Sequence, residues 1–374
     1  MPLTHALDAD IYVLACSQAT DAADLVALGD HHSVHVVQIT DAAIVPLAVF
    51  HLGARVTALG WSAGAVSPSV SDDWHIDLVA GSADFGLFHL SKLAGRDECI
   101  YNFGAGSTGH NGGVNSIAFV GGYPADSTRY VATCGGDKTV LVWDLYPERV
   151  NDDARASAPP PPDASVAPED RTPPTAYEIP YAHPLTTVCA HPHTSKELLV
   201  ADTHGTIFLV DWRSDDPSTP QPDRRTVLEL VQPYAMGDAL IGNGDSTWTS
   251  VAWRRDTTDI IGSVTGNKYH IWDLAKLHGG KPLVTGPTFS QGGKFRWCNT
   301  HPEFFAISSS SPATGAILHV HNLGYLTQQP TQLAVAAKPH YVRDFDFLAT
   351  RGVPRIAAAV GRSLVIMPIG ATEK

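Results

Sequence analysis

The stretch that most restricts the possible folds is residues 130–145, YVATCGGDKTVLVWDL. Residues 130–134 form a short apolar run, and residues 135–137 form a Gly-Gly-Asp turn cluster. Residues 139–144 form a second run, apolar and β-branched, that ends in Trp-Asp. Because apolar, β-branched runs of this length on either side of a turn favour paired strands, the stretch predicts a β-hairpin.

A Gly-His pair at residues 109–110 precedes this hairpin, and the order Gly-His, hairpin, Trp-Asp is typical of one blade of a WD-repeat β-propeller. The order recurs along the chain in weaker form. Trp272-Asp273 again ends a third strand, whereas Val210-Asp211 and His321-Asn322 take the Trp-Asp place in two other units. Each unit begins with one strand, and seven such strands can be counted. We predict that they end at Cys16, Trp61, Phe119, Ala190, Trp253, Trp297 and Phe347.

The last unit contains only three apolar runs. A propeller pairs its first and last blades to avoid two open sheet edges, so the residues before Asp10 would supply the missing strand. We therefore predict an all-β chain in which residues 1–374 form a single seven-bladed WD40-type β-propeller, closed by an N-terminal strand that completes the last blade. Six blades with a stray N-terminal segment, or two β-sandwiches, are the alternatives. A helical solenoid is excluded because no 3.6-residue period is sustained.

Two segments interrupt the repeat. Residues 151–176 hold seven prolines among Asp, Ala and Ser, a composition that cannot bury enough apolar surface to offset the entropy of ordering. We expect a disordered loop inserted in the third blade, with a linker between two domains as the rival interpretation. Residues 214–226 predict a shorter Pro- and Asp-rich loop in the fourth blade.

Composition narrows the classes of partner. The formal net charge of −13 disfavours direct nucleic-acid binding by broad electrostatic attraction, so we expect none. The five cysteines are widely spaced without a CxxC pair, so neither a disulfide framework nor a thiolate zinc site is indicated. The N-terminus does not resemble a secretory signal, and no apolar run approaches 18 residues, so we expect no membrane insertion.

One constellation looks catalytic at first sight. His110, Thr133, Asp137 and Trp143 fall where WD repeats place a hydrogen-bond network that joins a loop, two strands and a turn. A His and an Asp could also form part of a catalytic triad. Because the same parts recur down the chain, we interpret the four residues as a structural network that pins one blade.

Other motifs give little support for an enzyme. His31, His32 and His35 form the densest histidine cluster, but no third ligand type lies nearby, and His191 and His193 are expected to be exposed in a loop. Residues 135–139 resemble a phosphate loop superficially, yet a strand follows where that motif needs a helix. GxSxG is absent. We therefore predict no catalytic residue, cofactor or metal.

Two tryptophans lie outside the repeating positions. Trp74 stands in a polar loop and Trp248 just ahead of a strand. Tryptophan often anchors protein interfaces, so both are candidate partner-binding residues. Capping of a blade end is the alternative role for each.

Several sequence segments that depart from the regular repeat resemble segments of one known family, and they match it in order and spacing as well. They are RVTALGWS, TTVCAHP, DTHGTIFLVD, SVAWRRDTTDIIGSVTGNKYHIWD, KFRWCNTHPEFFAISS and LHVHNLG. Through them the chain resembles the family of small WD-repeat nucleoporins numbered thirty-seven, which belongs to the Y-shaped scaffold complex of the nuclear pore. Phe295-Arg296-Trp297 and residues 321–324 are the most telling, because they are not generic WD-repeat phrases.

The resemblance implies a nuclear protein of the nuclear envelope and pore. It implies a non-enzymatic scaffold in the outer ring that supports nucleocytoplasmic transport. The implied partners are the largest arm subunit of the Y complex, itself a propeller fused to a helical solenoid, and other Y-complex subunits. The two inserts depart from the family pattern. Two alternatives stay open, a WD-repeat adaptor that reads a peptide or histone tail at the channel, and a hydrolase on a propeller scaffold.

Overall fold

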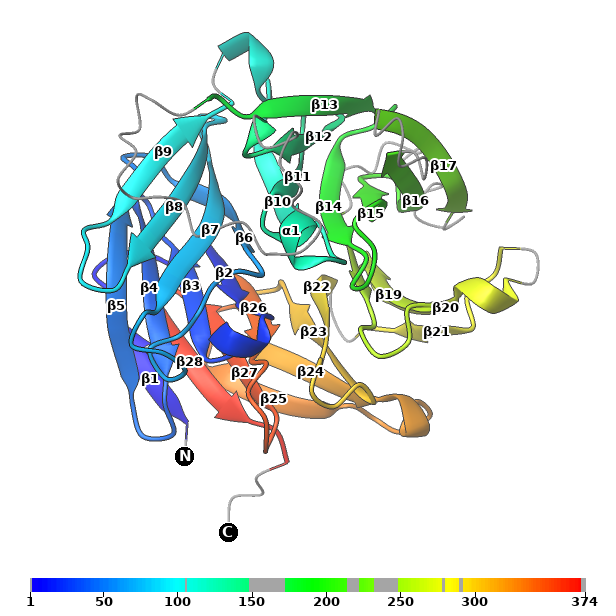
Figure 1. Ribbon diagram of the computed structural model, residues 1–374. Coiled ribbons are helices and arrows are strands. Elements are labelled where there is room, and N and C mark those ends of the chain that lie inside the picture. Colours follow the sequence, from blue (N-terminus) through cyan, green and yellow to red (C-terminus); the bar gives the residue numbers. More distant parts are fainter. Residues whose placement is uncertain are drawn as a thin grey trace.

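The computed structural model describes residues 2–104, 106–147, 172–213, 222–231, 248–277, 280–288 and 292–370. These residues form seven four-stranded antiparallel sheets that are arranged as blades around a centre (Figure 1). Six blades consist of four consecutive strands, whereas the seventh has the order β1-β28-β27-β26. The prediction of a seven-bladed β-propeller closed by an N-terminal strand is confirmed.

The strands follow one another from the centre of the ring outward. The first three blades are β2 (Val13–Cys16), β3 (Leu25–Gly29), β4 (Ser33–Ile39), β5 (Ile44–His51); β6 (Val56–Trp61), β7 (His75–Ser82), β8 (Leu87–Leu93), β9 (Cys99–Phe103); and β10 (Val114–Phe119), β11 (Tyr130–Gly135), β12 (Thr139–Asp144), β13 (Thr175–Pro180). The next three are β14 (Leu185–Ala190), β15 (Glu197–Asp202), β16 (Thr206–Arg213), β17 (Pro222–Val231); β18 (Thr249–Trp253), β19 (Ile260–Thr265), β20 (Lys268–Asp273), β21 (Val284–Pro287); and β22 (Gly292–Trp297), β23 (Phe304–Ser309), β24 (Ala316–Asn322), β25 (Thr331–Ala336).

The seventh blade runs β26 (Asp344–Phe347), β27 (Arg355–Val360), β28 (Ser363–Pro368) and β1 (Leu3–Ala6). Short helical turns of the described residues are α1 (Pro124–Ser127), η1 (Thr20–Ala22), η2 (Gly106–Thr108), η5 (Leu274–Lys276) and η6 (Leu323–Tyr325). None of these helices could cross a membrane.

The seven inner strands form the closed inner ring. β2, β6, β10, β14, β18, β22 and β26 each contact the next, and β26 contacts β2 again. The sequence predicted the last residue of each of these strands, and all seven predictions are confirmed. They succeeded because each inner strand is a local apolar run bounded by a turn.

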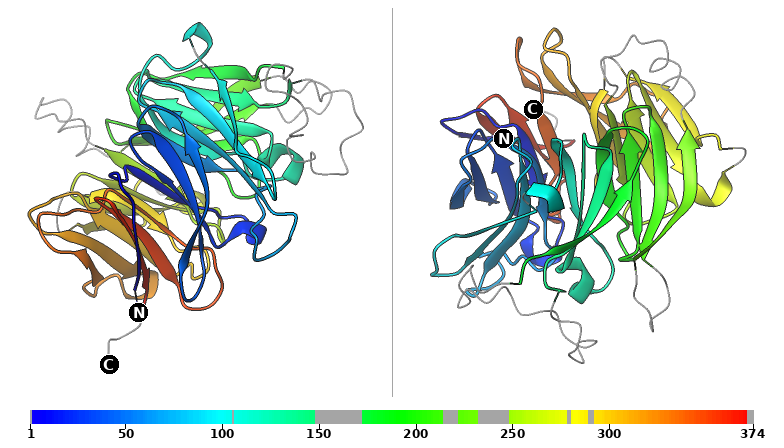
Figure 2. Two further views of the ribbon diagram at one scale, coloured as in Figure 1. Left: turned by 90° about the vertical axis from the view of Figure 1, so that its left-hand side faces the viewer. Right: turned by 90° about the horizontal axis from the view of Figure 1, so that it is seen from above.

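A seam in the seventh blade joins the two ends of the sequence. Leu3 pairs with Ile366 and His5 with Leu364, and the Leu7 N–H donates to the Arg362 carbonyl at 2.8 Å just beyond the ladder. β1 and β28 therefore lie side by side, as Figures 1 and 2 show from three directions. Pairing these strands leaves the ring without an open edge at this point.

The core lies between blades rather than within one layer. The seven largest hydrophobic clusters of the described residues each span two neighbouring blades. Between the fifth and sixth blades the Phe295 ring is fully buried, and a Cβ added to Gly262 would lie 2.1 Å from it. A buried Phe contributes about 1.5–3 kcal/mol, so close packing of this kind holds each blade to the next.

Loops gather on two faces of the ring. We call face 1 the face that carries the loops between first and second strands and between third and fourth strands of each blade. Face 2 carries the loops between second and third strands and the connections from one blade to the next. The first-to-second-strand loops of face 1 are residues 17–24, 62–74, 120–129, 191–196, 254–259, 298–303 and 348–354.

Both predicted inserts connect third to fourth strands, so they begin and end on face 1. β13 starts at Thr175, inside the predicted insert 151–176, because Thr175 pairs with Asp144 of β12. β17 starts at Pro222, inside the predicted insert 214–226, since the ladder with β16 extends that far. Residues 148–171 and 214–221 lie outside the described residues, and the loop character of the inserts stays a prediction.

Candidate functional site

The inner strands enclose a cavity of about 830 Å³ at the centre of the ring. All seven inner strands contribute to its wall, and loops that follow them on face 1 line its mouth. Because strand side chains alternate between two faces, every second residue of an inner strand can project into this cavity. The cavity is therefore the place where polar side chains of all seven blades can meet.

The first ion pair in the cavity joins three blades. Lys294 of β22 donates from Nζ to Asp344 Oδ2 of β26 at 2.7 Å. The same oxygen accepts the Leu14 N–H of β2 at 3.0 Å, and Oδ1 accepts the Phe345 N–H at 2.8 Å. Burial lowers the pKa of Lys294, although the Asp344 carboxylate opposes that shift. Asp344, itself buried, thus holds a half-buried cation and a backbone N–H of another blade together.

A second, looser pair repeats this arrangement. Arg296 Nε lies 4.0 Å from Asp346 Oδ1, and Asp346 Oδ2 accepts the Cys16 N–H at 3.2 Å. Burial raises the pKa of Asp346, while the Arg296 guanidinium opposes the shift. The same three blades are therefore connected twice, by residues spaced two apart on β22 and on β26.

Hydrogen bonds also cross the mouth of the cavity. Gln18 donates from Nε2 to the Phe347 carbonyl at 3.1 Å, and Asn299 donates from Nδ2 to the Gln18 side-chain oxygen. Arg255 donates from Nη1 to the Gln18 carbonyl at 3.1 Å. These hydrogen bonds join residues of the first, fifth, sixth and seventh blades at the mouth of the cavity. They restrict movement of these four blades relative to one another.

The thiols that face the cavity are poor nucleophiles. Burial raises the pKa of Cys16 well above its usual value, and burial raises the pKa of Cys189 to about 11. The thiolate is the reactive form of cysteine, so these groups are largely protonated at neutral pH. All five cysteines are free.

The structure brings together the four residues of the predicted network in the third blade. His110 contacts Asp137 Oδ2 through Nδ1 and Thr133 Oγ1 through Nε2, each at 2.8 Å. Trp143 donates from Nε1 to Thr133 Oγ1 at 3.0 Å. The preceding Gly109 approaches so closely that a Cβ there would lie 1.5 Å from the Gly104 carbonyl oxygen. The four groups bond to one another, and the Thr133 hydroxyl beside the His110 imidazole is fully buried.

Other blades replace this network with simpler contacts. In the fifth blade Trp272 donates from Nε1 to Ser263 Oγ at 3.1 Å. In the sixth blade His321 takes the place of the tryptophan and stacks on Phe305, with ring centroids 4.7 Å apart and planes within 2°. The aromatic ring is retained at this place because it fills the space between neighbouring blades.

Three buried histidines make stability sensitive to acid. Burial lowers the pKa values of His191, His270 and His321 to about 4. In the unfolded chain their pKa values are near 6.5, so below that pH the unfolded state binds more protons. Stability is therefore complete above about pH 6.5 and falls toward pH 4, by up to about 3 kcal/mol for each imidazole.

We expect urea unfolding at pH 7, 6, 5 and 4 to show this loss. His321→Phe keeps an aromatic ring on Phe305 but cannot be protonated, so its stability should fall less steeply with pH than that of the unaltered protein. Equal slopes for the two proteins would contradict the assignment.

The histidines that the sequence grouped do not converge. His35 Nε2 contacts Asp30 Oδ2 at 2.9 Å, whereas His31 Nε2 contacts the Tyr12 hydroxyl at 2.6 Å, and His32 is exposed. The expectation of an exposed His191 is wrong. Its ring is buried, because Nδ1 accepts the N–H groups of His193 and Thr194, each at 3.0 Å, and so holds the loop after β14.

Exposed apolar side chains gather on face 1. Among the described residues, the five most exposed large hydrophobic side chains are 57% to 79% exposed and all lie on its loops, namely Val70, Tyr123, Leu283, Tyr325 and Val353. Face 2 carries Phe85 and Tyr341, which are only 40% and 37% exposed. Exposed aromatic and aliphatic groups can anchor a protein interface, so face 1 is the candidate docking face.

The two tryptophans proposed from the sequence are less exposed. Trp74 is half-buried against the hydrophobic cluster between the first and second blades. Trp248 is half-buried immediately before β18 on face 2. The partner-binding role of either residue stays a prediction. Tyr123 and Tyr325 were not predicted, because an isolated tyrosine in a loop gives no sequence signal that distinguishes exposure from capping.

Comparison with known proteins supplies the family context. The chain matches no protein-family model. It is 23% identical to Nucleoporin Nup37 of Mus musculus over 292 residues, 78% of this chain and 71% of that protein. It is 22% identical to Nucleoporin Nup37 of Homo sapiens over 280 residues, 75% of this chain and 68% of that protein.

Among solved structures, the chain superposes on Raptor of Chaetomium thermophilum with a TM-score of 0.64 at 15% identity. The match covers 98% of this chain and 29% of that one, and at this identity it shows the fold alone. The sequence similarity and the ring agree with each other. This chain is a seven-bladed WD-repeat β-propeller that resembles the Nup37 nucleoporins.

Proposed function

We propose that this chain is a non-enzymatic scaffold subunit of the nuclear pore complex outer ring. In this role it docks on the largest arm subunit of the Y complex and supports nucleocytoplasmic transport. The observation that carries the proposal is the similarity to Nup37 over 78% of the chain, which spans most of the closed ring.

The physical properties of the ring support a scaffold. The polar groups of the cavity are largely bonded to one another across blades, and the mouth is crossed by the Gln18 contacts. A surface that is already rigid loses little conformational freedom when it binds. The buried thiols and the internally satisfied His110 network offer no activated nucleophile.

We further propose that face 1 is the docking face and that Tyr123 and Tyr325 are its anchors. They lie on loops of the third and sixth blades, so a partner that contacts both must span the mouth of the cavity. A large subunit with its own propeller and solenoid has surface enough for such a contact, since stable interfaces cover about 800 Å² on each partner.

Co-expression with the large arm subunit tests this proposal. We expect one complex of one-to-one stoichiometry in size-exclusion chromatography. The double variant Tyr123→Ser/Tyr325→Ser should weaken the complex at least about 10-fold, because truncating an anchor commonly costs more than 1 kcal/mol. Tyr341→Ser, an exposed tyrosine on face 2, is the matched control. Separate peaks for the unaltered proteins would refute docking, and equal loss with Tyr341→Ser would refute face 1.

A second candidate, an adaptor that reads a peptide or histone tail at the channel, is favoured only by the size of the central cavity. Lys294 and Arg296 already lie beside the carboxylates of Asp344 and Asp346, which leaves fewer free partners for a tail. Fluorescence anisotropy with labelled histone-tail peptides distinguishes the two functions. Saturable binding that Asp346→Asn abolishes would favour the adaptor.

A further inference from the structure

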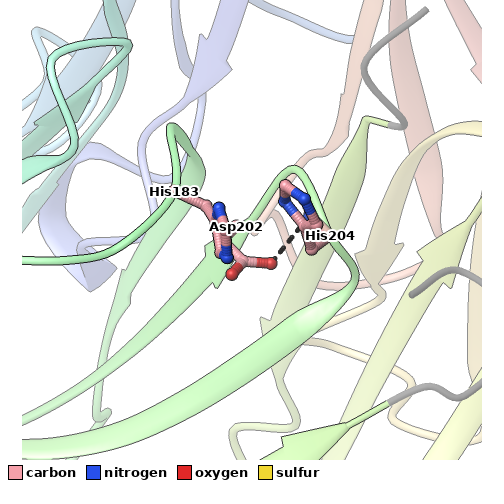
Figure 3. Close-up of side chains that lie close together, drawn as sticks. All are labelled: His183, Asp202 and His204. Carbon is pink, nitrogen blue, oxygen red and sulfur yellow. Dashed lines mark hydrogen bonds between the residues drawn. The ribbon is translucent and has the colours of Figure 1, made fainter. Parts of the chain in front are cut away.

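A cluster of potential metal ligands lies on face 2 of the fourth blade, away from the cavity. His183 precedes β14, Asp202 ends β15 and His204 lies in the turn to β16. One ligand atom from each residue lies within 4.8 Å of the others. Figure 3 shows the three side chains gathered where this turn meets the loop before β14.

The contacts of the three residues leave ligand atoms available. Asp202 Oδ1 accepts the N–H groups of His204 and Thr206 at 2.9 and 2.8 Å, so the turn fixes the carboxylate. Among the described residues, Asp202 Oδ2 receives no hydrogen bond. The two imidazole rings are stacked, with centroids 3.6 Å apart and planes at 29°.

Comparison with the third blade shows that a histidine in the β15–β16 turn is unusual. Strand register aligns Thr206 with Thr139, because Ala201 pairs with Ile207 as Cys134 pairs with Val140. His204 therefore stands where the third blade has Asp137, the acceptor for the His110 ring. In the fourth blade an imidazole replaces that acceptor; it stacks on His183, and its Nδ1 lies 3.4 Å from the Thr203 hydroxyl. Two stacked imidazoles do not satisfy each other as a histidine and an aspartate do, whereas a shared cation would satisfy both.

We propose that His183, Asp202 and His204 bind one divalent transition-metal ion of the Zn²⁺ class. Two imidazole nitrogens and one carboxylate oxygen suit this class of ion. A tetrahedral ion with ligand bonds near 2.0–2.1 Å needs ligand atoms about 3.3 Å apart, so side-chain rotation within the two loops must close the present spacing. A fourth position would hold water. The ion would join the loop before β14 to the β15–β16 turn.

The proposal departs from the sequence prediction of no metal, and it is independent of the proposed function. Its test uses the full, tag-free chain after chelation, titrated with Zn²⁺ alone in a calorimeter. We expect one Zn²⁺ per chain, a higher Tm with the ion, and visible d–d absorption when Co²⁺ replaces Zn²⁺.

His183→Asn and His204→Asn should each weaken Zn²⁺ binding at least about 100-fold, since even loss of an outer partner of a ligand costs 10- to 100-fold. Asp202→Asn keeps an oxygen for the turn and should weaken binding without unfolding the blade. His340→Asn, an exposed histidine on the same face, should bind normally. Equal Tm values of all variants without metal exclude misfolding. Absence of binding, or binding that persists in His204→Asn, would overturn the proposal.

Discussion

Replacing His5 by proline is expected to lower the free energy of unfolding by about 2–4 kcal/mol, because it breaks the seam that closes the ring. Leu7 donates its N–H to Arg362, and antiparallel strands alternate which residues face the partner strand. The N–H of His5 therefore faces β28, where it pairs with Leu364. Proline has no N–H, so it would leave a carbonyl of β28 without its donor.

Thr4→Pro supplies the matched control for this prediction. By the same alternation the Thr4 N–H faces solvent, where an edge strand tolerates proline. We expect its stability to lie within about 1 kcal/mol of the unaltered protein, which is the usual range of surface substitutions. Urea unfolding measures both effects. If the two variants unfold alike, the seam is not held by the β1–β28 ladder. Light scattering should also detect association of His5→Pro through the exposed edge of β28.

The second large effect is expected at Asp344. Asp344→Ala removes the counterion of Lys294 and the acceptor of the Leu14 N–H. Breaking a buried pair from one side costs about 3–5 kcal/mol, because the other charge is left uncompensated. Asp344 is 1% exposed, whereas the Lys294 side chain is 23% exposed, so we expect the cost to lie at the lower end of this range for a buried pair. Chemical unfolding should show a loss of that size, with a matching fall in Tm.

Two comparisons isolate the cause of the loss at Asp344. The double variant Lys294→Met/Asp344→Asn removes both charges and keeps an acceptor, so it should recover more than 1 kcal/mol relative to the sum of its single variants. Asp256→Ala removes one partner of an exposed pair with Arg254 and should cost at most about 1 kcal/mol. A loss for Asp344→Ala no greater than that for Asp256→Ala would show that the pair does not hold the blades.

The blade architecture was predictable because its signals are local. Turn glycines, β-branched runs and the Trp-Asp position of a blade lie within about 15 residues of one another in the sequence. The ends of the inner strands at Trp253, Trp297 and Phe347 could be predicted from them. The closing strand was predictable for a different reason, since a ring with a three-stranded last blade would have open edges.

Only part of the arrangement of the polar cavity could be predicted from the sequence. Residues 294–297 and 344–347 each alternate a charged residue with an aromatic one, so a period of two was visible. That the aromatic rings enter the core and the charges meet in the cavity depends on β22 and β26 being neighbours. Neighbouring strands from different blades are set by ring closure, which no local pattern encodes.

The histidines on face 2 were likewise not predictable from local sequence patterns. His183 and His204 are 21 positions apart in the sequence and were not grouped, whereas His31, His32 and His35 were grouped and point to different partners. Closeness in sequence is a poor guide to convergence in a sheet, because adjacent strand residues face opposite ways. The burial of His191 was missed because its backbone partners lie in an irregular loop.

The position of β1 has a consequence for how the molecule is made. During synthesis the first six blades can each be completed as their four consecutive strands emerge, but β1 must wait for β28, which follows every other described strand. The Leu14–Asp344 contact likewise joins residues 330 positions apart. Contacts so distant in sequence form slowly. We therefore expect the β1–β28 ladder and the Leu14–Asp344 contact to be among the last parts of the ring to form.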